Sequence, residues 1–244
     1  MFETNIKVAV DTHTHTLASG HAYCTIKEMA AKAAELGLDG LAITEHAPEM
    51  PGTCHKFYFQ NLSIMPRKMN GIEILFGTEL NIMDTQGTVD LDDWVLDEMN
   101  LVIASIHPPC YGKSRGRELN TQAYLNIMKN PKIDVIGHPD DGRYEVDYRM
   151  IAQVAKETGT LLEINNSSLR PGGFRKDTYE NAKKMLEYCK EYGTMITLGS
   201  DAHVDTEIAC TEFSSKVLRD VDFPEYLIAN TSLEKLKKCL KRNK

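Results

Sequence analysis

Seven short apolar runs recur along the chain, and helical patterns separate most of them. The runs are IKVAVD, GLAIT, IEILFGTEL, NLVIASI, KIDVIG, TLLEIN and MITLGS, which begin at residues 6, 40, 72, 100, 132, 160 and 195. Strands that are apolar throughout and alternate with amphipathic helices indicate a parallel sheet covered by helices. Seven such units in 244 residues are too many for most open sheets and favour a (β/α) barrel.

Three segments carry complete helix signals. We predict helices over 25–37, 146–159 and 177–193, which end at Gly37, Gly159 and Gly193. The first and third also have a capping box, formed by Thr25 with Glu28 and by Asp177 with Glu180. The alternative fold is a doubly wound open sheet, which favours a glycine-rich G-x-G-x-x-G after its first strand. This chain has DTHTH there. It has no linker or low-complexity tract, so we predict one domain over residues 1–244.

Composition narrows the function classes. The formal net charge of −7 argues against a surface that grips nucleic acid, and the basic KLKKCLKRNK at the C-terminus is predicted to be a solvated last helix. There is no apolar run of 18 residues and no signal-peptide pattern, so we expect a cytoplasmic protein without a membrane partner. The six cysteines lack C-x-x-C spacing, which indicates free thiols. No motif encodes an oligomeric state.

Histidines and carboxylates stand where the apolar runs end. Seven of the eight histidines and two carboxylates have such positions: His13, His15, His21, His46, Glu79, His107, His138, Asp201 and His203. In a barrel these ends converge on one rim, where active sites lie. The H-x-H pair also points both imidazoles to the same side of a strand.

Neutral imidazole and carboxylate are ligands for zinc, manganese or iron. Nine candidate ligands exceed what one tetrahedral ion can use, so the sequence predicts a multinuclear metal site at the C-terminal rim. The remaining histidine, His55, lies in a loop bounded by glycine and proline. We interpret it as a loop residue near the pocket mouth, with an accessory ligand role beside Cys54 as the weaker alternative.

The ordered series DTHTHT, ITEHAP, GTELNI, ASIHPP, IGHPD, LEINNSS and GSDAH resembles the PHP (polymerase and histidinol phosphatase) family, in particular its YcdX-like phosphatase branch. The resemblance spans residues 7–203. It implies a distorted (β/α)7, TIM-like barrel that holds three metal ions, usually zinc. It also implies three ligand sets: His13, His15, Glu79 and Asp201 for one ion, Glu79 with His107 and His138 for a second, and His21, His46 and His203 for a third.

Hydrolysis of small phosphate monoesters is the expected activity. Divalent ions lower the pKa of a bound water to roughly 7 and neutralise charge on phosphoryl oxygens. We therefore expect a metal-bound hydroxide to attack phosphorus, with Glu79, His107 and Asp201 as catalytic residues and a small phosphorylated metabolite as the substrate. The cofactors would be three divalent ions, Zn²⁺ by expectation, with Mn²⁺ or Fe²⁺ as alternatives. No cysteine nucleophile is required, so Cys110 is interpreted as a bystander.

The sequence EINNSSLRPGGFRK, which begins at Glu163, follows the sixth run on the same rim. Asn165, Ser167 and Arg170 are candidate substrate contacts, since arginine offers a bidentate fork to phosphate oxygens. An ordinary loop with solvated arginines, Arg170 and Arg175 among them, remains the other interpretation. The basic loop with Lys113, Arg115 and Arg117 is interpreted as solvated.

Other functions compete with this one. A PHP-type nuclease would use the same centre, but the chain has no polymerase domain and no long basic groove. An amidohydrolase would cleave C–N bonds on a similar barrel, although such enzymes commonly use a carboxylated lysine where this chain offers Glu79. A non-catalytic protein that stores or senses metal would bind ions without turnover.

Overall fold

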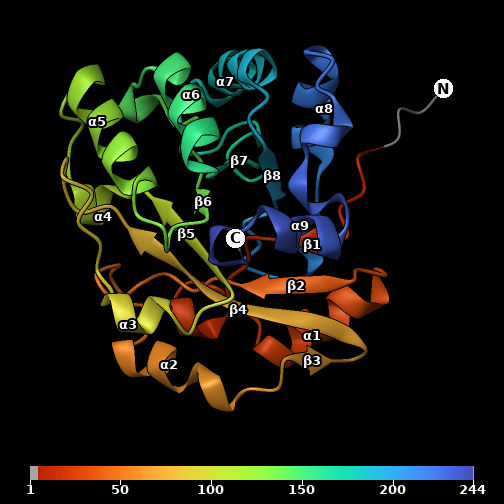
Figure 1. Ribbon diagram of the computed structural model, residues 1–244. Coiled ribbons are helices and arrows are strands. Elements are labelled where there is room, and N and C mark those ends of the chain that lie inside the picture. Colours follow the sequence, from red (N-terminus) through yellow and green to blue (C-terminus); the bar gives the residue numbers. More distant parts are fainter. Residues whose placement is uncertain (1–4, 244) are drawn as a thin grey trace.

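The computed structural model describes residues 5–243. The two ends of the predicted domain, residues 1–4 and residue 244, therefore lie outside the described residues. Parallel strands surround a common axis, which Figure 1 views end-on. The strands are β1 (Val10–Asp11), β2 (Gly40–Ile43), β3 (Lys68–Met69), β4 (Ile72–Asn81), β5 (Leu101–Ser105), β6 (Val135–Ile136), β7 (Leu161–Asn165) and β8 (Ile196–Gly199).

Seven of these strands pair in parallel in the order β1-β2-β4-β5-β6-β7-β8. Val10 lies opposite Gly40 at one end of this series, and Asn165 lies opposite Gly199 at the other. The predicted barrel-like α/β fold is therefore confirmed. Two details differ from the prediction: β1 is shorter than the apolar run at 6–11, and β3 is an additional strand that pairs antiparallel with β4.

β1 and β8 are joined by a side chain instead of a regular ladder. The Nδ2 of Asn230, a fully buried residue, donates to the carbonyl oxygens of Val10 (2.8 Å) and Leu198 (2.8 Å), and its Oδ1 accepts from the Leu198 amide (3.1 Å). Farther along, the Asp201 amide donates to the His13 carbonyl at 2.9 Å. This closure brings the first and last predicted ligands together.

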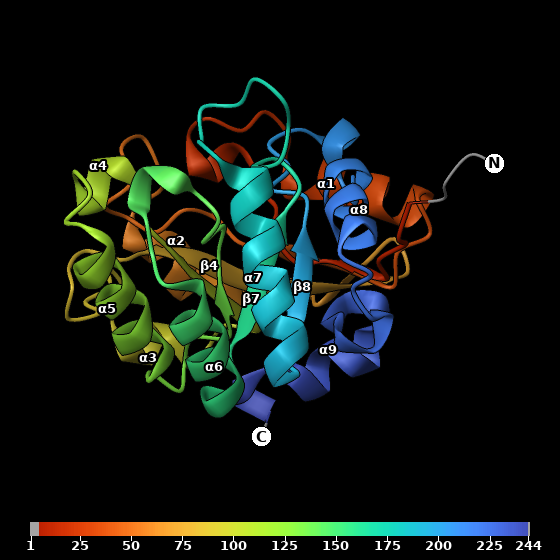
Figure 2. The same ribbon diagram turned by 90° about the horizontal axis from the view of Figure 1, so that it is seen from above.

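Helices cover the outside of the sheet (Figures 1 and 2). They are α1 (Ile26–Glu35), α2 (Lys56–Gln60), α3 (Asp93–Leu96), α4 (Pro108–Tyr111), α5 (Arg117–Met128), α6 (Tyr148–Thr158), α7 (Thr178–Tyr192), α8 (Glu212–Asp220) and α9 (Leu233–Cys239). Short 3₁₀ turns also occur, including η1 (Leu17–Ser19) between β1 and α1 and η6 (Ala229–Thr231) before α9. Among the described residues, no helix is both long and apolar enough to span a membrane.

The helix signals were mostly correct. Thr25 and Glu28 form the predicted capping box of α1, and Gly159 and Gly193 end α6 and α7 in the left-handed conformation. The capping box predicted for Asp177 is wrong. Asp177 itself has a left-handed backbone (φ 53°) and makes no side-chain capping bond, because the glycine-rich loop enters α7 by a tight turn instead of an extended residue.

Side chains inside the barrel change from apolar to polar along the strands. The apolar layer near the N-terminal ends includes Leu75 of β4, Leu101 and Ile103 of β5, and Leu161 of β7. Two residues beyond Ile103, the inward-facing Ser105 already donates to a carboxylate. A second, larger apolar core lies between the sheet and the helices. The packed lower layer therefore supports a polar upper layer at the C-terminal rim.

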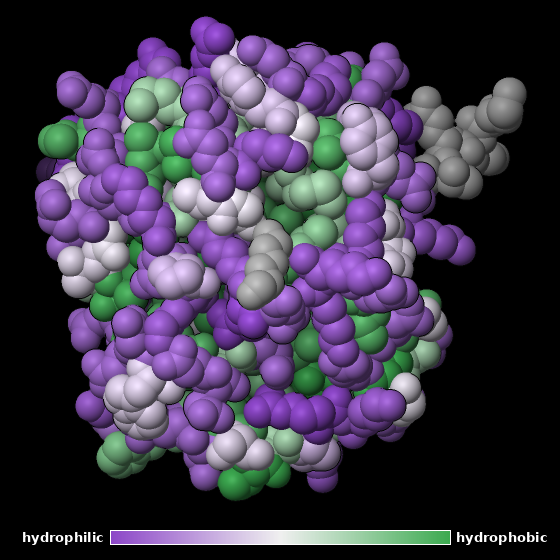
Figure 3. All heavy atoms as spheres, in the orientation of Figure 1, coloured by the Kyte–Doolittle hydropathy of each residue, from purple (hydrophilic) through white to green (hydrophobic). Residues whose placement is uncertain are grey.

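The basic C-terminal segment covers the opposite end of the barrel from this rim (Figures 1 and 2). Leu236 and Leu240 pack into the interior apolar layer, while Lys238 is 74% exposed. Figure 3 shows this end as mainly hydrophilic. The prediction of a solvated helix therefore holds for the outer face of α9 but not for the face toward the barrel. Hydrophobic burial, which a charge pattern does not reveal, anchors the segment.

Arg242 fixes the end of this segment on a buried acid. Its Nε donates to Asp134 Oδ2 at 2.8 Å, and the Asp134 side chain is fully buried. Burial raises the pKa of Asp134 above its usual value, although Arg242 and two backbone amides act in the opposite direction. We expect Arg242→Ala to lower the free energy of unfolding by about 3 kcal/mol at neutral pH, because the buried carboxylate loses its cation.

The raised pKa of Asp134 determines how the cost of Arg242→Ala changes with pH. The native state binds the Asp134 proton more tightly than the unfolded chain, so protonation relieves the penalty of the unpaired charge. The cost of Arg242→Ala should therefore shrink as the pH falls from neutral into the acid range, where the raised pKa lets Asp134 bind its proton. Urea unfolding of both proteins at several pH values measures this difference; a cost that grows toward acid pH would contradict it.

Candidate metal centre

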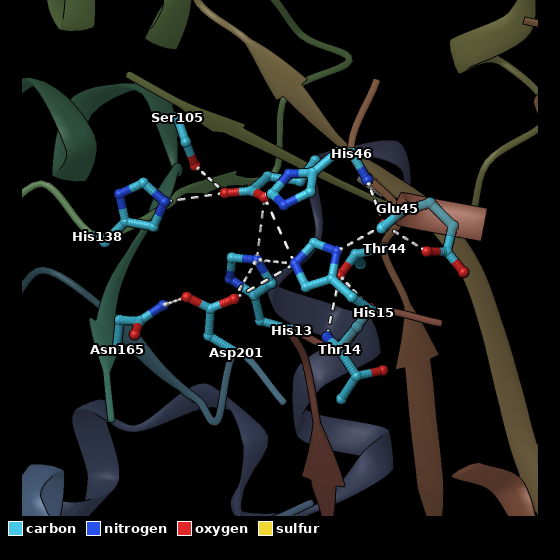
Figure 4. A network of polar contacts seen from close by, with 12 residues as sticks. His13, Thr14, His15, Thr44, Glu45, His46, Ser105, His138, Asn165 and Asp201 are labelled. Atoms are coloured by element: carbon cyan, nitrogen blue, oxygen red, sulfur yellow. Dashed lines mark hydrogen bonds and ion pairs between the residues drawn. The ribbon is translucent and has the colours of Figure 1, made fainter. Parts of the chain in front are cut away.

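The predicted metal ligands meet at the C-terminal rim from six strands. His13 and His15 follow β1, Glu79 lies near the end of β4, and the others follow their strands directly or after a short turn. The strands that contain or precede these ligands are buried. Figure 4 shows His13, His15, His46, His138 and Asp201 turned toward one another.

Glu79 lies at the centre of this cluster and is fully buried. Its Oε2 lies 2.7 Å from His46 Nδ1, 3.4 Å from His13 Nε2 and 3.6 Å from His15 Nε2. Its Oε1 lies 2.9 Å from His138 Nε2 and 3.2 Å from His107 Nε2. One carboxylate therefore presents a different oxygen to each of two imidazole groups.

Asp201 stands on the other side of the H-x-H pair. Its Oδ1 lies 3.3 Å from His15 Nε2 and 3.7 Å from His13 Nε2. Asp201 (φ 57°) and His138 (φ 31°) both have positive-φ backbones, which cost on the order of 1–3 kcal/mol each in a non-glycine residue. The fold maintains this strain at the ends of two strands, where it directs both side chains into the cluster.

A group of histidines lies closer to solvent. The ring centroid of His21 is 4.9 Å from those of His46 and His203, and His15 lies 4.2 Å from His46 and 4.4 Å from His203. His203 Nδ1 lies 2.9 Å from the carbonyl oxygen of Asp201. His21 is exposed. The structure therefore brings together the predicted outer trio, with His21 at its open edge.

The inward-facing nitrogens are oriented by a second layer of acceptors. His13 Nδ1 lies 2.7 Å from Glu163 Oε1, and His107 Nδ1 lies 2.7 Å from Asn81 Oδ1. Each acceptor accepts a hydrogen bond from the Nδ1–H group, so Nε2 carries no proton and is free to bind a metal. Gly199 makes room for the first pair, because a Cβ there would lie 2.0 Å from Glu163 Oε1. Neither orienting role was predicted from the sequence.

The charges suit metal ligands. Burial raises the pKa of Glu79, but His107, His13 and His46 outweigh it and hold that pKa well below its usual range. Burial lowers the pKa of His15 well below its usual range, with the neighbouring His46 acting in the same direction. Glu79 is thus favoured as a carboxylate and His15 as a neutral imidazole at neutral pH, and these are the forms that bind metal.

Unpartnered atoms indicate where a cation fits. Among the described residues, His46 Nδ1, Glu79 Oε2 and His107 Nε2 are buried without a hydrogen-bond partner. The first two are only 2.7 Å apart, yet they form no hydrogen bond. Burial lowers the pKa of His13, but the surrounding carboxylates raise it well above its usual value. A site that attracts positive charge and leaves ligand atoms unpaired fits a metal ion.

The three predicted substrate contacts have different surroundings. Asn165 is fully buried beside the proposed metal ligands, where its Nδ2 donates to Asp201 Oδ2 at 3.2 Å. Ser167 is half-buried in the loop that follows. Arg170 is 47% exposed, and its Nη2 contacts Glu207 Oε1 at 2.5 Å, outside the cluster.

Arg175, in the same loop, reaches the cluster instead. Its side chain is 8% exposed, and its Nη1 lies 3.4 Å from Asp201 Oδ2 and 2.9 Å from Ser168 Oγ. The Phe174 ring lies 5.0 Å from its guanidinium, and the loop rises above the rim in Figure 2. Arg175 was not among the substrate contacts predicted from the sequence.

His55 and Cys110 have structural roles or surroundings that explain them without a function in the metal centre. His55 caps α2, where its Nδ1 accepts the amide of Phe57 at 3.3 Å. Burial raises the pKa of Cys110 to about 12, and its Sγ contacts the carbonyl oxygen of Glu49. A thiol that stays protonated is a poor nucleophile.

Residues 11–169 match the family described as "PHP domain". A probable phosphatase of Thermoanaerobacter sp. strain X514 is 44% identical over 239 residues, which cover 98% of this chain and 97% of that protein. A probable phosphatase of Caldanaerobacter subterraneus is 41% identical, with coverages of 98% and 93%. Histidinol phosphate phosphatase from Lactococcus lactis, solved with zinc, L-histidinol and phosphate, has the same fold (TM-score 0.60, 20% identity, 91% of this chain and 95% of that chain).

Proposed function

This chain belongs to the PHP family, and on that premise we propose that it is a metal-dependent phosphatase that hydrolyses small phosphate monoesters at a trinuclear, zinc-binding centre. Relatives that match nearly the whole chain are named probable phosphatases. The Lactococcus lactis phosphatase of the same fold was solved with zinc and phosphate. Both observations support the reaction class.

The arrangement of Glu79 is the observation that carries the proposal. Its two oxygens face separate histidine groups at distances of 2.7–3.6 Å. A carboxylate in this position can bridge two ions, as the resemblance to the family implies. A purely structural carboxylate would instead be satisfied by hydrogen-bond donors, whereas Glu79 Oε2 has none.

The proposed ligand sets follow the spatial groups. His13, His15 and Asp201 would hold one ion together with Glu79. His107 and His138 would hold a second ion, also together with Glu79. His21, His46 and His203 would hold the third ion, nearer to solvent. His46 Nδ1 also lies against Glu79, so the third position would adjoin the first two.

Bound divalent ions would supply nucleophile activation and charge neutralisation at the phosphoryl group. The chain itself would supply orientation and one further positive charge. Arg175, held beside Asp201, would bind phosphoryl oxygens by its guanidinium fork. Asn165 fixes Asp201 by donating to Oδ2. Glu163 and Asn81 hold His13 and His107 in the orientation that presents Nε2.

Metal content and phosphatase turnover should be measured on the same sample. We expect about three zinc ions per chain by mass spectrometry and hydrolysis of p-nitrophenyl phosphate that a chelator abolishes and zinc or manganese restores. Two to three ions without phosphatase turnover would overturn the proposed reaction and favour amide substrates, nucleic acid or metal storage. Fewer than one ion, without recovery on adding metal, would overturn the metal centre.

Replacing His21 tests whether the outer metal position is separate from the other two. We expect His21→Ala to lose one ion per chain while the other two remain, because His21 lies at the exposed edge of the outer trio, with its ring centroid 4.9 Å from those of His46 and His203. Metal analysis of the purified variant measures this loss. Release of all three ions would show that the outer position is not separate from the other two.

A further inference from the structure

Glu45 is a buried carboxylate just before His46, and the proposed ligand sets do not use it. It is fully buried. Its Oε2 accepts the Thr16 amide at 3.0 Å and the Ser19 hydroxyl at 2.5 Å, and its Oε1 accepts the Thr16 hydroxyl at 2.5 Å. The Tyr58 hydroxyl is a fourth, longer donor at 3.4 Å. In Figure 4 the carboxylate of Glu45 points away from the histidine cluster.

Ser19 connects Glu45 to the cluster. Its hydroxyl has a single proton, which it donates to Glu45 Oε2. The oxygen also accepts the amide of His46 at 3.1 Å and lies 3.0 Å from His15 Nδ1. Because the proton of Ser19 is already committed, the oxygen can only accept from His15. This requires a proton on His15 Nδ1 and leaves Nε2 unprotonated.

The free Nε2 of His15 faces the proposed first metal position. It lies 3.1 Å from His13 Nε2, 3.3 Å from Asp201 Oδ1 and 3.6 Å from Glu79 Oε2. The opposite tautomer would place a proton among these ligand atoms and remove one metal-binding lone pair.

The other orienting acceptors do not need such help. Glu163, which holds His13, is a carboxylate, and the Asn81 atom that holds His107 is an amide oxygen. A carboxylate oxygen and an amide oxygen carry no proton, so both can only accept a hydrogen bond. A serine hydroxyl can donate or accept, so its direction must be set by a further group. At His15 that group is Glu45.

We propose that Glu45 is a positioning residue that, through Ser19, holds His15 in the tautomer that binds metal. This inference rests on the proposed metal centre. It assigns a role to Glu45, which lies just after β2 and outside the ligand shell, and to Ser19 on the turn that joins β1 to α1. Orienting groups of this kind change metal affinity by about 10–100-fold.

Three variants of the zinc-loaded protein test the proposal. Glu45→Leu removes the acceptor, so the Ser19 proton can turn to His15 Nδ1. Ser19→Ala removes the link itself. We expect each to weaken retention of one zinc ion by about 10–100-fold in a titration with a competing chelator. Glu45→Gln should recover most of this loss, because its amide oxygen can take the place of Oε2 while the Thr16 hydroxyl turns to accept from the NH₂ group.

Two further readouts separate positioning from general stability. In the double variant, Glu45→Leu should add little to Ser19→Ala, because both act through one path. Nitrogen-15 spectra of labelled histidines should show a protonated Nδ1 on His15 in the unaltered protein and a loss of that signal in Glu45→Leu. Tyr58→Phe, which removes only the 3.4 Å bond to Glu45, is the matched control and should retain zinc normally.

Normal zinc retention in both Glu45→Leu and Ser19→Ala would overturn the proposal, as would an unprotonated Nδ1 on His15 in the unaltered protein. If Glu45→Leu does not fold, Ser19→Ala decides by the same zinc titration. These outcomes are distinct from failure of the proposed function, which would appear as missing zinc or missing phosphatase turnover in the unaltered protein.

Discussion

Glu79→Gln is expected to abolish turnover and to weaken two metal positions at once. The amide keeps the size of the side chain but removes the charge and one acceptor from a buried site that faces five imidazoles. Loss of the metal contribution is worth several kcal/mol of transition-state stabilisation, so kcat should fall by at least about 10³-fold. Metal analysis and p-nitrophenyl phosphate hydrolysis on one preparation measure both effects.

His55→Ala is the control for this experiment. His55 is a histidine of the same chain, but it caps α2 and contacts Phe57. Its removal should leave the metal count unchanged and kcat within about 2-fold, as for an ordinary surface substitution. Full activity together with full metal content in Glu79→Gln would contradict the proposal that two ions share Glu79.

The ligands could be found from the sequence because their positions follow from strand geometry. A parallel barrel collects the C-terminal ends of its strands, so a residue that follows an apolar run can be placed without coordinates. His107 and His138, each directly after such a run, are examples, and the structure places both against Glu79 Oε1. The ligands can be placed at the rim in this way even when the order of the strands in the barrel is unknown.

The orienting residues could not be found in this way. Asn81, Ser19 and Glu45 act through hydrogen bonds between segments that are 26–29 residues apart in the chain. Polar residues of these types also occur in ordinary loops and caps, and they carry no periodic signal. Their roles depend on which atoms meet in three dimensions. The closure of the barrel by Asn230 is a similar case, because one buried amide replaces a ladder.

The choice between Arg170 and Arg175 shows the same limit at closer range. Both lie in one glycine-rich loop, and arginine chemistry alone fits either to phosphate. The structure separates them by a partner that is distant in sequence: Glu207 engages Arg170, while Asp201 and Ser168 lie beside Arg175. The conformation of the loop decides which arginine faces the site, and the periodicity of apolar residues does not predict that conformation.

This difference leads to a paired prediction. Arg175→Gln should lower kcat/KM by about 10²–10³-fold, because the reaction loses a buried cation placed to bind phosphoryl oxygens. Arg170→Gln should change kcat/KM by no more than about 3-fold, since its exposed ion pair with Glu207 contributes little. Steady-state kinetics with p-nitrophenyl phosphate on both variants measures the contrast.

Metal content must be determined on the same preparations, because Arg175 also lies 3.4 Å from a proposed ligand, Asp201. We expect a normal metal count in both variants, so that the kinetic loss in Arg175→Gln reports on substrate binding and transition-state charge. Loss of metal from Arg175→Gln would instead make Arg175 a residue that supports Asp201. A larger kinetic loss in Arg170→Gln would show that the loop rearranges around the substrate and that the contact expected from the sequence forms only then.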